Sequence, residues 1–170
     1  KMPKNLSSLI INKNQLESIP EGLPEEMVEF NISSNRIKSL KGGPLKVTKS
    51  YLCQSQRIAE PLDLEGCAEE IGGDFDCSGN NLTSLEKGPI NIGGSVTLSN
   101  NNMTEIGGRL KSVCTKSGSV RLENNNLATL EGIPLGLSSY KIEAKKNLLP
   151  SKSLIETYQY AEMYGSWLAA

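Results

Sequence analysis

The feature that most constrains this sequence is an internal repeat with a period near 21 residues. Each copy carries two apolar residues at alternate positions, and the first of them recurs at positions 9, 30, 51, 75, 96, 120 and 140. The steps are therefore 21, 21, 24, 21, 24 and 20 residues, and segments 30–44, 75–89 and 120–134 repeat at a longer spacing of 45. One such copy cannot bury its own apolar face, so the copies must stack and share a continuous core. The sequence thus predicts a solenoid.

A polar amide follows the second apolar position of most copies, three residues later. The second inward position is predicted at Ile11, Ile32, Cys53, Cys77, Leu98, Leu122 and Ile142. The amide column is predicted at Asn14, Asn35, Gln56, Asn80, Asn101 and Asn125. These amides should point inward and satisfy backbone groups at the bend after each strand, where the loss of one partner costs about 1–3 kcal/mol. The seventh copy, which begins at Leu137, is interpreted as having Lys145 in place of the amide.

The connectors between the predicted strands are rich in glycine and proline, with glycine pairs at 42–43, 72–73, 93–94 and 107–108. Glycine permits positive φ and close backbone approach, whereas proline fixes φ. We therefore expect an irregular convex side of extended segments or short helical turns rather than full helices. Aromatic residues make up only 5% of the chain, which favours a narrow, mainly aliphatic core.

The two ends of the chain depart from the repeat. We predict a solenoid of about seven turns over residues 1–149 and a C-terminal capping helix over 150–170. One helical stripe is predicted at Leu154, Ile155, Tyr158 and Ala161, and a second at Tyr160, Met163, Tyr164 and Trp167. An aromatic helix that binds a partner is the alternative to a cap. The N-terminal turn has no comparable cap, so its strand is either an edge open to edge-to-edge pairing with a second copy, or covered by an upstream segment.

Particular segments resemble a known family. LSSLIINKNQL at 6–16 fits the pattern L-x-x-L-x-L-x-x-N-x-L, and the chain resembles a leucine-rich-repeat protein over about residues 6–148. IPEGLPEEM at 19–27 is similar to the proline-containing repeats of bacterial effectors. IGGDFDCSGNNLTSLEKGP at 71–89 resembles the repeats of proteins encoded by tailed bacteriophages and some bacteria. The resemblance implies a leucine-rich-repeat solenoid with a curved parallel β-sheet, a protein-binding concave face and no catalytic residue.

The composition argues against several classes of function. The chain contains no histidine, which removes histidine-based catalysis and nearly all zinc-enzyme sites. Its formal net charge of −1 argues against binding to a nucleic-acid backbone. No segment approaches the roughly 18 apolar residues of a transmembrane helix, no signal peptide is evident, and no phosphate-binding glycine loop follows a strand. We therefore expect no cofactor, no membrane partner and no nucleic-acid partner.

Two carboxylates, Asp74 and Asp76, suggest either metal binding or catalysis. The alternative is that both are solvated surface charges. With Ser78 and Gly79 they match the opening of an EF-hand loop, but the twelfth position is Leu85 where a glutamate is needed. Paired carboxylates can also hydrolyse glycosides, yet no aromatic platform accompanies these two. Solvated charges on a binding face are the favoured interpretation, and no metal site is expected.

The four cysteines, at positions 53, 67, 77 and 114, form no C-x-x-C pair and have no histidine partner, so a zinc site is not favoured. Cys53 and Cys77 occupy the same ladder position in adjacent turns, about 4.8 Å apart by strand spacing. A disulfide is therefore conceivable. Reduced, buried thiols in a cytoplasmic protein are the favoured alternative.

The strand residues that point away from the core form the best candidate binding surface. The predicted protein-binding residues on this concave face are Ile10, Asn31, Leu52, Asp74, Asp76, Thr97, Arg121, Glu123 and Lys141. Apolar anchors lie at one end, acidic residues at the centre and basic residues at the other end, a mixture that suits protein recognition. The alternative is that these are simply solvated strand residues.

Three functional hypotheses follow. The first is a non-enzymatic protein-binding module, encoded by a phage or a bacterium, that binds and modulates or inhibits a host bacterial protein in the cytoplasm. The second is the substrate-recognition domain of a larger bacterial effector such as a ubiquitin ligase. The third, least favoured, is an enzyme that uses Asp74 and Asp76.

Overall fold

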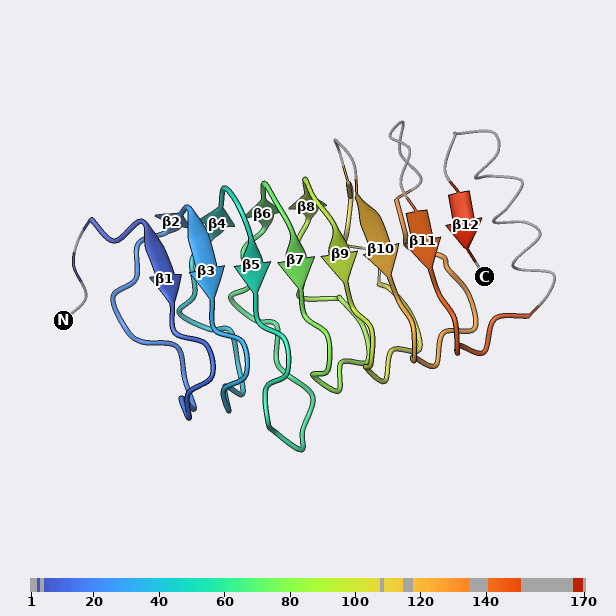
Figure 1. The fold of residues 1–170 in the computed structure, drawn as a ribbon, viewed down its shortest axis with the longest axis horizontal. Helices are drawn as coiled ribbons and strands as arrows, with labels where there is room; N and C mark the ends of the chain where they lie inside the picture. Colours follow the sequence, from blue (N-terminus) through green and yellow to red (C-terminus); the bar gives the residue numbers. More distant parts are fainter. Residues whose placement is uncertain are drawn as a thin grey trace.

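Each copy of the repeat forms one coil of a parallel β-solenoid (Figure 1). The computed structural model describes residues 3, 5–107, 109–114, 118–134, 141–150 and 167–169. In spatial order the main sheet consists of β1 (Ser8–Ile10), β3 (Glu29–Asn31), β5 (Tyr51–Leu52), β7 (Phe75–Asp76), β9 (Val96–Thr97), β10 (Ser119–Arg121), β11 (Lys141–Glu143) and β12 (Trp167–Ala169). We number the coils 1 to 7 by the strands β1 to β11 of this sheet. The predicted repeat solenoid with a parallel sheet is confirmed.

A second parallel sheet lies behind the main sheet, and the sequence did not predict it. It consists of β2 (Glu26–Met27), β4 (Lys46–Val47), β6 (Glu70–Ile71) and β8 (Asn91–Ile92). These strands fall in the connectors, for which extended segments or helical turns were expected. Figure 1 shows the strands of both sheets stacked along the long axis of the molecule. No helix is present in the described residues, and hence none there that could cross a membrane.

The core between the two sheets is a set of ladders in register. The main sheet aligns Leu9, Phe30, Tyr51, Phe75, Val96, Val120 and Ile142. Met27, Val47, Ile71 and Ile92 of the second sheet face them, each no more than 2% exposed. The rings of Phe30 and Tyr51 pack edge to face with centroids 5.0 Å apart, and those of Tyr51 and Phe75 with centroids 5.9 Å apart. The expected aliphatic core therefore contains an aromatic stack across coils 2 to 4.

The predicted amide column is confirmed as an inward-pointing, hydrogen-bonded ladder except at Asn14, which is exposed and donates to the carbonyls of Ile11 and Asn12 in its own coil. From coil 2 onward, each amide donates to a carbonyl of its own coil and to a carbonyl of the preceding coil. Gln56 makes the same pair of bonds, to Cys53 (3.1 Å) and Ile32 (2.9 Å), and its Oε1 accepts from the backbone N–H of Ile37 at 3.0 Å. Its longer side chain thus reproduces the asparagine contacts.

The residue before each amide turns the chain by adopting the left-handed conformation. Its φ lies between 55° and 65° at Lys13, Ser34, Ser55, Gly79, Asn100, Asn124 and Lys146. A side chain in this conformation costs roughly 1–2 kcal/mol. The turn places the following amide over the backbone groups that it satisfies, which offsets that cost.

The seventh coil is shifted by two residues from the predicted alignment. Val120 pairs with Ile142, so the first inward position of this coil is residue 142 rather than 140. Asn147 then completes the amide column and donates from Nδ2 to the carbonyl of Ala144 at 3.0 Å. The prediction that Lys145 replaces the amide is wrong. The spacing Ile142-x-Ala144-x-x-Asn147 follows the repeat, but alanine is too small to mark an inward position by hydrophobicity.

The structure describes only part of the C-terminal segment for which the capping helix was predicted, but it describes the N-terminal strand. Residues 151–166 and 170 of the predicted capping helix lie outside the described residues. Trp167, which the second helical stripe included, belongs instead to strand β12, and β12 pairs in parallel with β11. Such pairing covers backbone groups that an edge strand would otherwise expose. At the other end β1 is the edge of the main sheet, and pairing of two copies there stays a prediction.

Candidate functional site

The outward side chains of the main sheet form one continuous surface, which we call the main-sheet face. Its first column contains Ser8, Glu29, Ser50, Asp74, Ser95, Ser119 and Lys141, and its middle column Ile10, Asn31, Leu52, Asp76, Thr97, Arg121 and Glu143. Eight of the nine predicted binding residues lie on this face, and the ninth, Glu123, lies two residues after β10. Lys141 is beside Ser119 rather than next in line after Arg121, because the seventh coil is shifted.

The apolar end of the main-sheet face lies on coils 1 to 3. Ile10 is 57% exposed, which makes it one of the most exposed large apolar residues among those described. Leu52 is partly buried, and Asn31 lies between the two in the same column. Asn31 is held in place, because its Oδ1 accepts from the backbone N–H of Ser33 at 3.1 Å and from its hydroxyl at 2.7 Å.

The two carboxylates at the centre of the face both make local hydrogen bonds to the backbone. Oδ1 of Asp76 accepts from the backbone N–H of Ser78 at 3.0 Å and from its hydroxyl at 2.7 Å, as Asn31 does two coils earlier. Oδ1 of Asp74 accepts from the backbone N–H of Ser95 at 2.7 Å. These bonds anchor each carboxylate through one oxygen, and the described residues give its second oxygen no hydrogen bond, an arrangement that suits a binding surface.

The described residues contain no group of three or more potential metal ligands. Phe75 and Cys77, which alternate with the two carboxylates, are fully buried. The segment is therefore a strand of the solenoid, as the repeat predicts, and its carboxylates do not converge as those of an EF-hand loop do.

The predicted basic end of the face is largely neutralised. Arg121 donates from Nε to Glu143 at 3.2 Å, and Lys141 also pairs with Glu143. The hydrogen bond from Lys141, followed by the charges of Lys141 and Arg121, lowers the pKa of Glu143. Beside this group, the Ser99 hydroxyl donates to Glu123 at 2.5 Å. The shifted register thus converts an expected positive patch into an ion-pair network.

Polar side chains on the outer side of the second sheet also bond to one another. Lys46 and Glu26 form an ion pair at 3.4 Å. Further along, Asn91 donates to Glu70 at 2.7 Å and accepts from the Ser112 hydroxyl at 2.7 Å. This side therefore provides a natural control surface for binding experiments.

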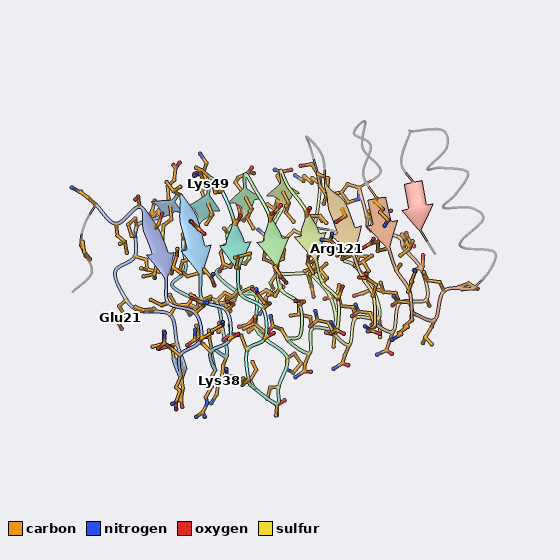
Figure 2. The ribbon with its side chains drawn as sticks, viewed as in Figure 1. Glu21, Lys38, Lys49 and Arg121 are labelled. Carbon is orange, nitrogen blue, oxygen red and sulfur yellow. The ribbon has the colours of Figure 1, made fainter. Side chains whose placement is uncertain are left out.

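A groove of about 500 Å³ opens at the edge of the solenoid, between segment 36–38 of coil 2 and loop 57–61 of coil 3, with Glu17 also lining it. We call it the lateral groove. Its cations are Arg36, Lys38 and Arg57. Sequence reasoning did not single them out, although the three extra residues between positions 51 and 75 marked coil 3 as irregular. Figure 1 shows the loop after β5 extending beyond the neighbouring loops, and Figure 2 places Lys38 at this lower edge.

All four cysteines are free and buried. Cys53 and Cys77 directly follow β5 and β7 at the same ladder position, as predicted, and the Cys53 thiol donates to the carbonyl of Asp76 at 3.5 Å. Burial raises the pKa of Cys53 and of Cys67 well above the usual range. These thiols are structural side chains rather than reactive groups.

Comparison with protein-family models, with curated proteins and with solved structures finds no match to this chain. The fold of this chain is therefore described from its own structure alone.

Proposed function

We propose that this chain is a non-enzymatic protein-binding module of the leucine-rich-repeat type, whose partner docks on the main-sheet face. The observation that carries this proposal is that polar side chains on the face are already held by their neighbours, as Asn31 is by Ser33, Asp76 by Ser78 and Arg121 by Glu143. A partner that docks there immobilises few additional side chains, so little conformational entropy is lost on binding.

The arrangement of apolar and polar groups supports the same proposal. Ile10 and Leu52 offer apolar contacts within a polar surround, and the serines of the first column leave room for a partner backbone to approach. The partner that we propose is a bacterial host protein, modulated or inhibited by a phage-encoded chain, because the repeats resemble those of phage and bacterial-effector proteins. This part of the proposal rests on the resemblance alone.

The test compares capture of bacterial proteins by the wild-type chain and by a Leu52→Arg variant, with mass spectrometry as readout. Leu45→Arg is the matched control, because Leu45 is 54% exposed and lies just before β4 of the second sheet. We expect one specific protein to be captured by the wild type and by Leu45→Arg, and lost with Leu52→Arg. Circular dichroism checks that both variants fold. Capture that survives Leu52→Arg would overturn docking on this face.

A further inference from the structure

The lateral groove contains two arginines on successive coils whose guanidinium groups have no partner among the described residues. The backbone N–H of Arg36 donates to the carbonyl of Leu16, and that of Arg57 to the carbonyl of Asn35, both at 2.8 Å. Each arginine directly follows the inward amide of its coil, Asn35 or Gln56, so the two occupy equivalent positions in coils about 4.8 Å apart. Within the described part of the chain, neither guanidinium forms a hydrogen bond or an ion pair, although Glu17 and Glu60 also line the groove.

The wall of the groove is fixed from the opposite side. Nδ2 of Asn81, in coil 4, donates to the carbonyls of Ile58 (3.2 Å) and Ala59 (3.3 Å). The backbone N–H of Leu62 donates to the carbonyl of Asn80 at 3.0 Å. The loop is thus tied to coil 4 through Ile58, Ala59 and Leu62. Its two ends are tied to coil 2 through Arg57 and Asp63, so the groove exists before any ligand enters.

The lining of the groove combines charge with an apolar surface. Ile58, Ala59 and Pro61 supply apolar atoms next to the arginines, and Ile58 packs against the core. A guanidinium offers a planar fork that binds a carboxylate through two parallel hydrogen bonds. Three cations and two carboxylates leave one net positive charge, which is too little for a nucleic-acid backbone with its closely spaced phosphates.

We infer that the lateral groove binds an acidic peptide segment of a partner protein, with one carboxylate between Arg36 and Arg57 and a neighbouring apolar side chain against Ile58 and Pro61. Glu17 and Glu60 disfavour segments with several adjacent carboxylates. The inference rests on the proposal that the partner is a protein, but it concerns a surface separate from the main-sheet face.

The probes are an array of seven-residue peptides and a single-stranded oligothymidylate. Each peptide has a central glutamate, glutamine or lysine with leucine or serine on either side. We expect the labelled protein to bind glutamate peptides with a leucine neighbour above all others. Binding that shows no preference for glutamate over glutamine, or that is strongest for the oligothymidylate, would overturn the inference.

The variants assign the binding to the groove. Arg36→Gln and Arg57→Gln should each weaken the best glutamate peptide about tenfold, as loss of a charged hydrogen bond does. Lys49→Gln and Lys111→Gln are the charge-matched controls; Figure 2 shows Lys49 at the edge opposite Lys38. Equal losses in all four variants would contradict a specific site. Leu52→Arg should leave peptide binding unchanged, so failure of the main-sheet proposal and failure of this inference are distinguishable.

Discussion

The side-chain oxygen of Asn101 accepts a hydrogen bond from the backbone N–H of Asn80 at 2.8 Å, although the two residues are 21 positions apart. The same oxygen accepts from the backbone N–H of Leu82 at 3.0 Å. Its Nδ2 donates to the carbonyls of Cys77 (3.1 Å) and Leu98 (2.9 Å). One buried amide therefore joins two coils through four bonds, and the same kind of contact recurs along the solenoid.

Asn101→Ala should destabilise the protein strongly, because it leaves backbone groups of two coils without partners in the core. We expect the free energy of unfolding to fall by about 3 kcal/mol or more. The matched control is Asn102→Ala at the next, exposed position, where a change within about 0.5 kcal/mol is expected. Urea denaturation followed by circular dichroism measures both, and equal midpoints would contradict the role of the column.

Tyr51→Phe should leave stability unchanged or raise it by up to about 1 kcal/mol. The phenol oxygen of Tyr51 is buried and has no hydrogen-bond partner among the described residues, whereas the ring packs between Phe30 and Phe75. Tyr51→Leu, which removes the ring, should instead cost about 2–3 kcal/mol. Thermal melting compares the two variants. A clear loss of stability in Tyr51→Phe would show that the hydroxyl has a partner.

Gly93→Ala should cost more than Gly42→Ala, because the two glycines are required for different reasons. A Cβ at Gly93 would lie 2.4 Å from the carbonyl oxygen of Gly72, so the stacked coils would have to move apart. We expect a loss of about 3 kcal/mol there. Gly42 has φ of 88° but open space around it, and alanine should cost only about 1–2 kcal/mol for the left-handed backbone. Parallel urea titrations compare the two stability losses. A larger loss in Gly42→Ala than in Gly93→Ala would refute the prediction.

Alkaline conditions should destabilise the fold, because its buried tyrosine and cysteine side chains resist losing their protons. Burial raises the pKa of Tyr51, Cys53 and Cys67 well above their usual range and that of Cys114 to about 11. The folded state keeps these groups neutral, so the stability that they contribute is fully present below the pKa of an unfolded thiol, about 8.5. It is lost progressively as the pH rises above that value.

Unfolding free energies at neutral pH and near pH 10 measure this loss. Cys67→Ala should be less stable than the wild type at neutral pH because it leaves a cavity. It should also lose less stability between the two pH values, since one titrating group is gone. The same decrease in both proteins would contradict the assignment to buried thiols.

The parts of the fold that the sequence predicted are those that repeat with a strong signal. Apolar residues at alternate positions mark the first six of the eight main-sheet strands, and the amides mark the bends. The seventh strand was misaligned because Ala144 gives no hydrophobic signal. The second sheet was missed because each of its strands contributes a single buried apolar residue, such as Ile71 in Glu70–Ile71, so no alternation marks it.

The sequence by itself determined the coil length, the inward ladders and the residues that face outward, since each follows from a period that only stacked coils can satisfy. The tertiary structure alone decided which outward side chains are free. Glu143 neutralises Arg121, which lies 22 positions before it, because the register of β10 and β11 brings them together. The guanidinium groups of Arg36 and Arg57 stay without a partner in the described residues, and Asn81 ties their neighbouring loop to the next coil. Such pairings depend on distances between coils, which a repeat pattern along the chain does not contain.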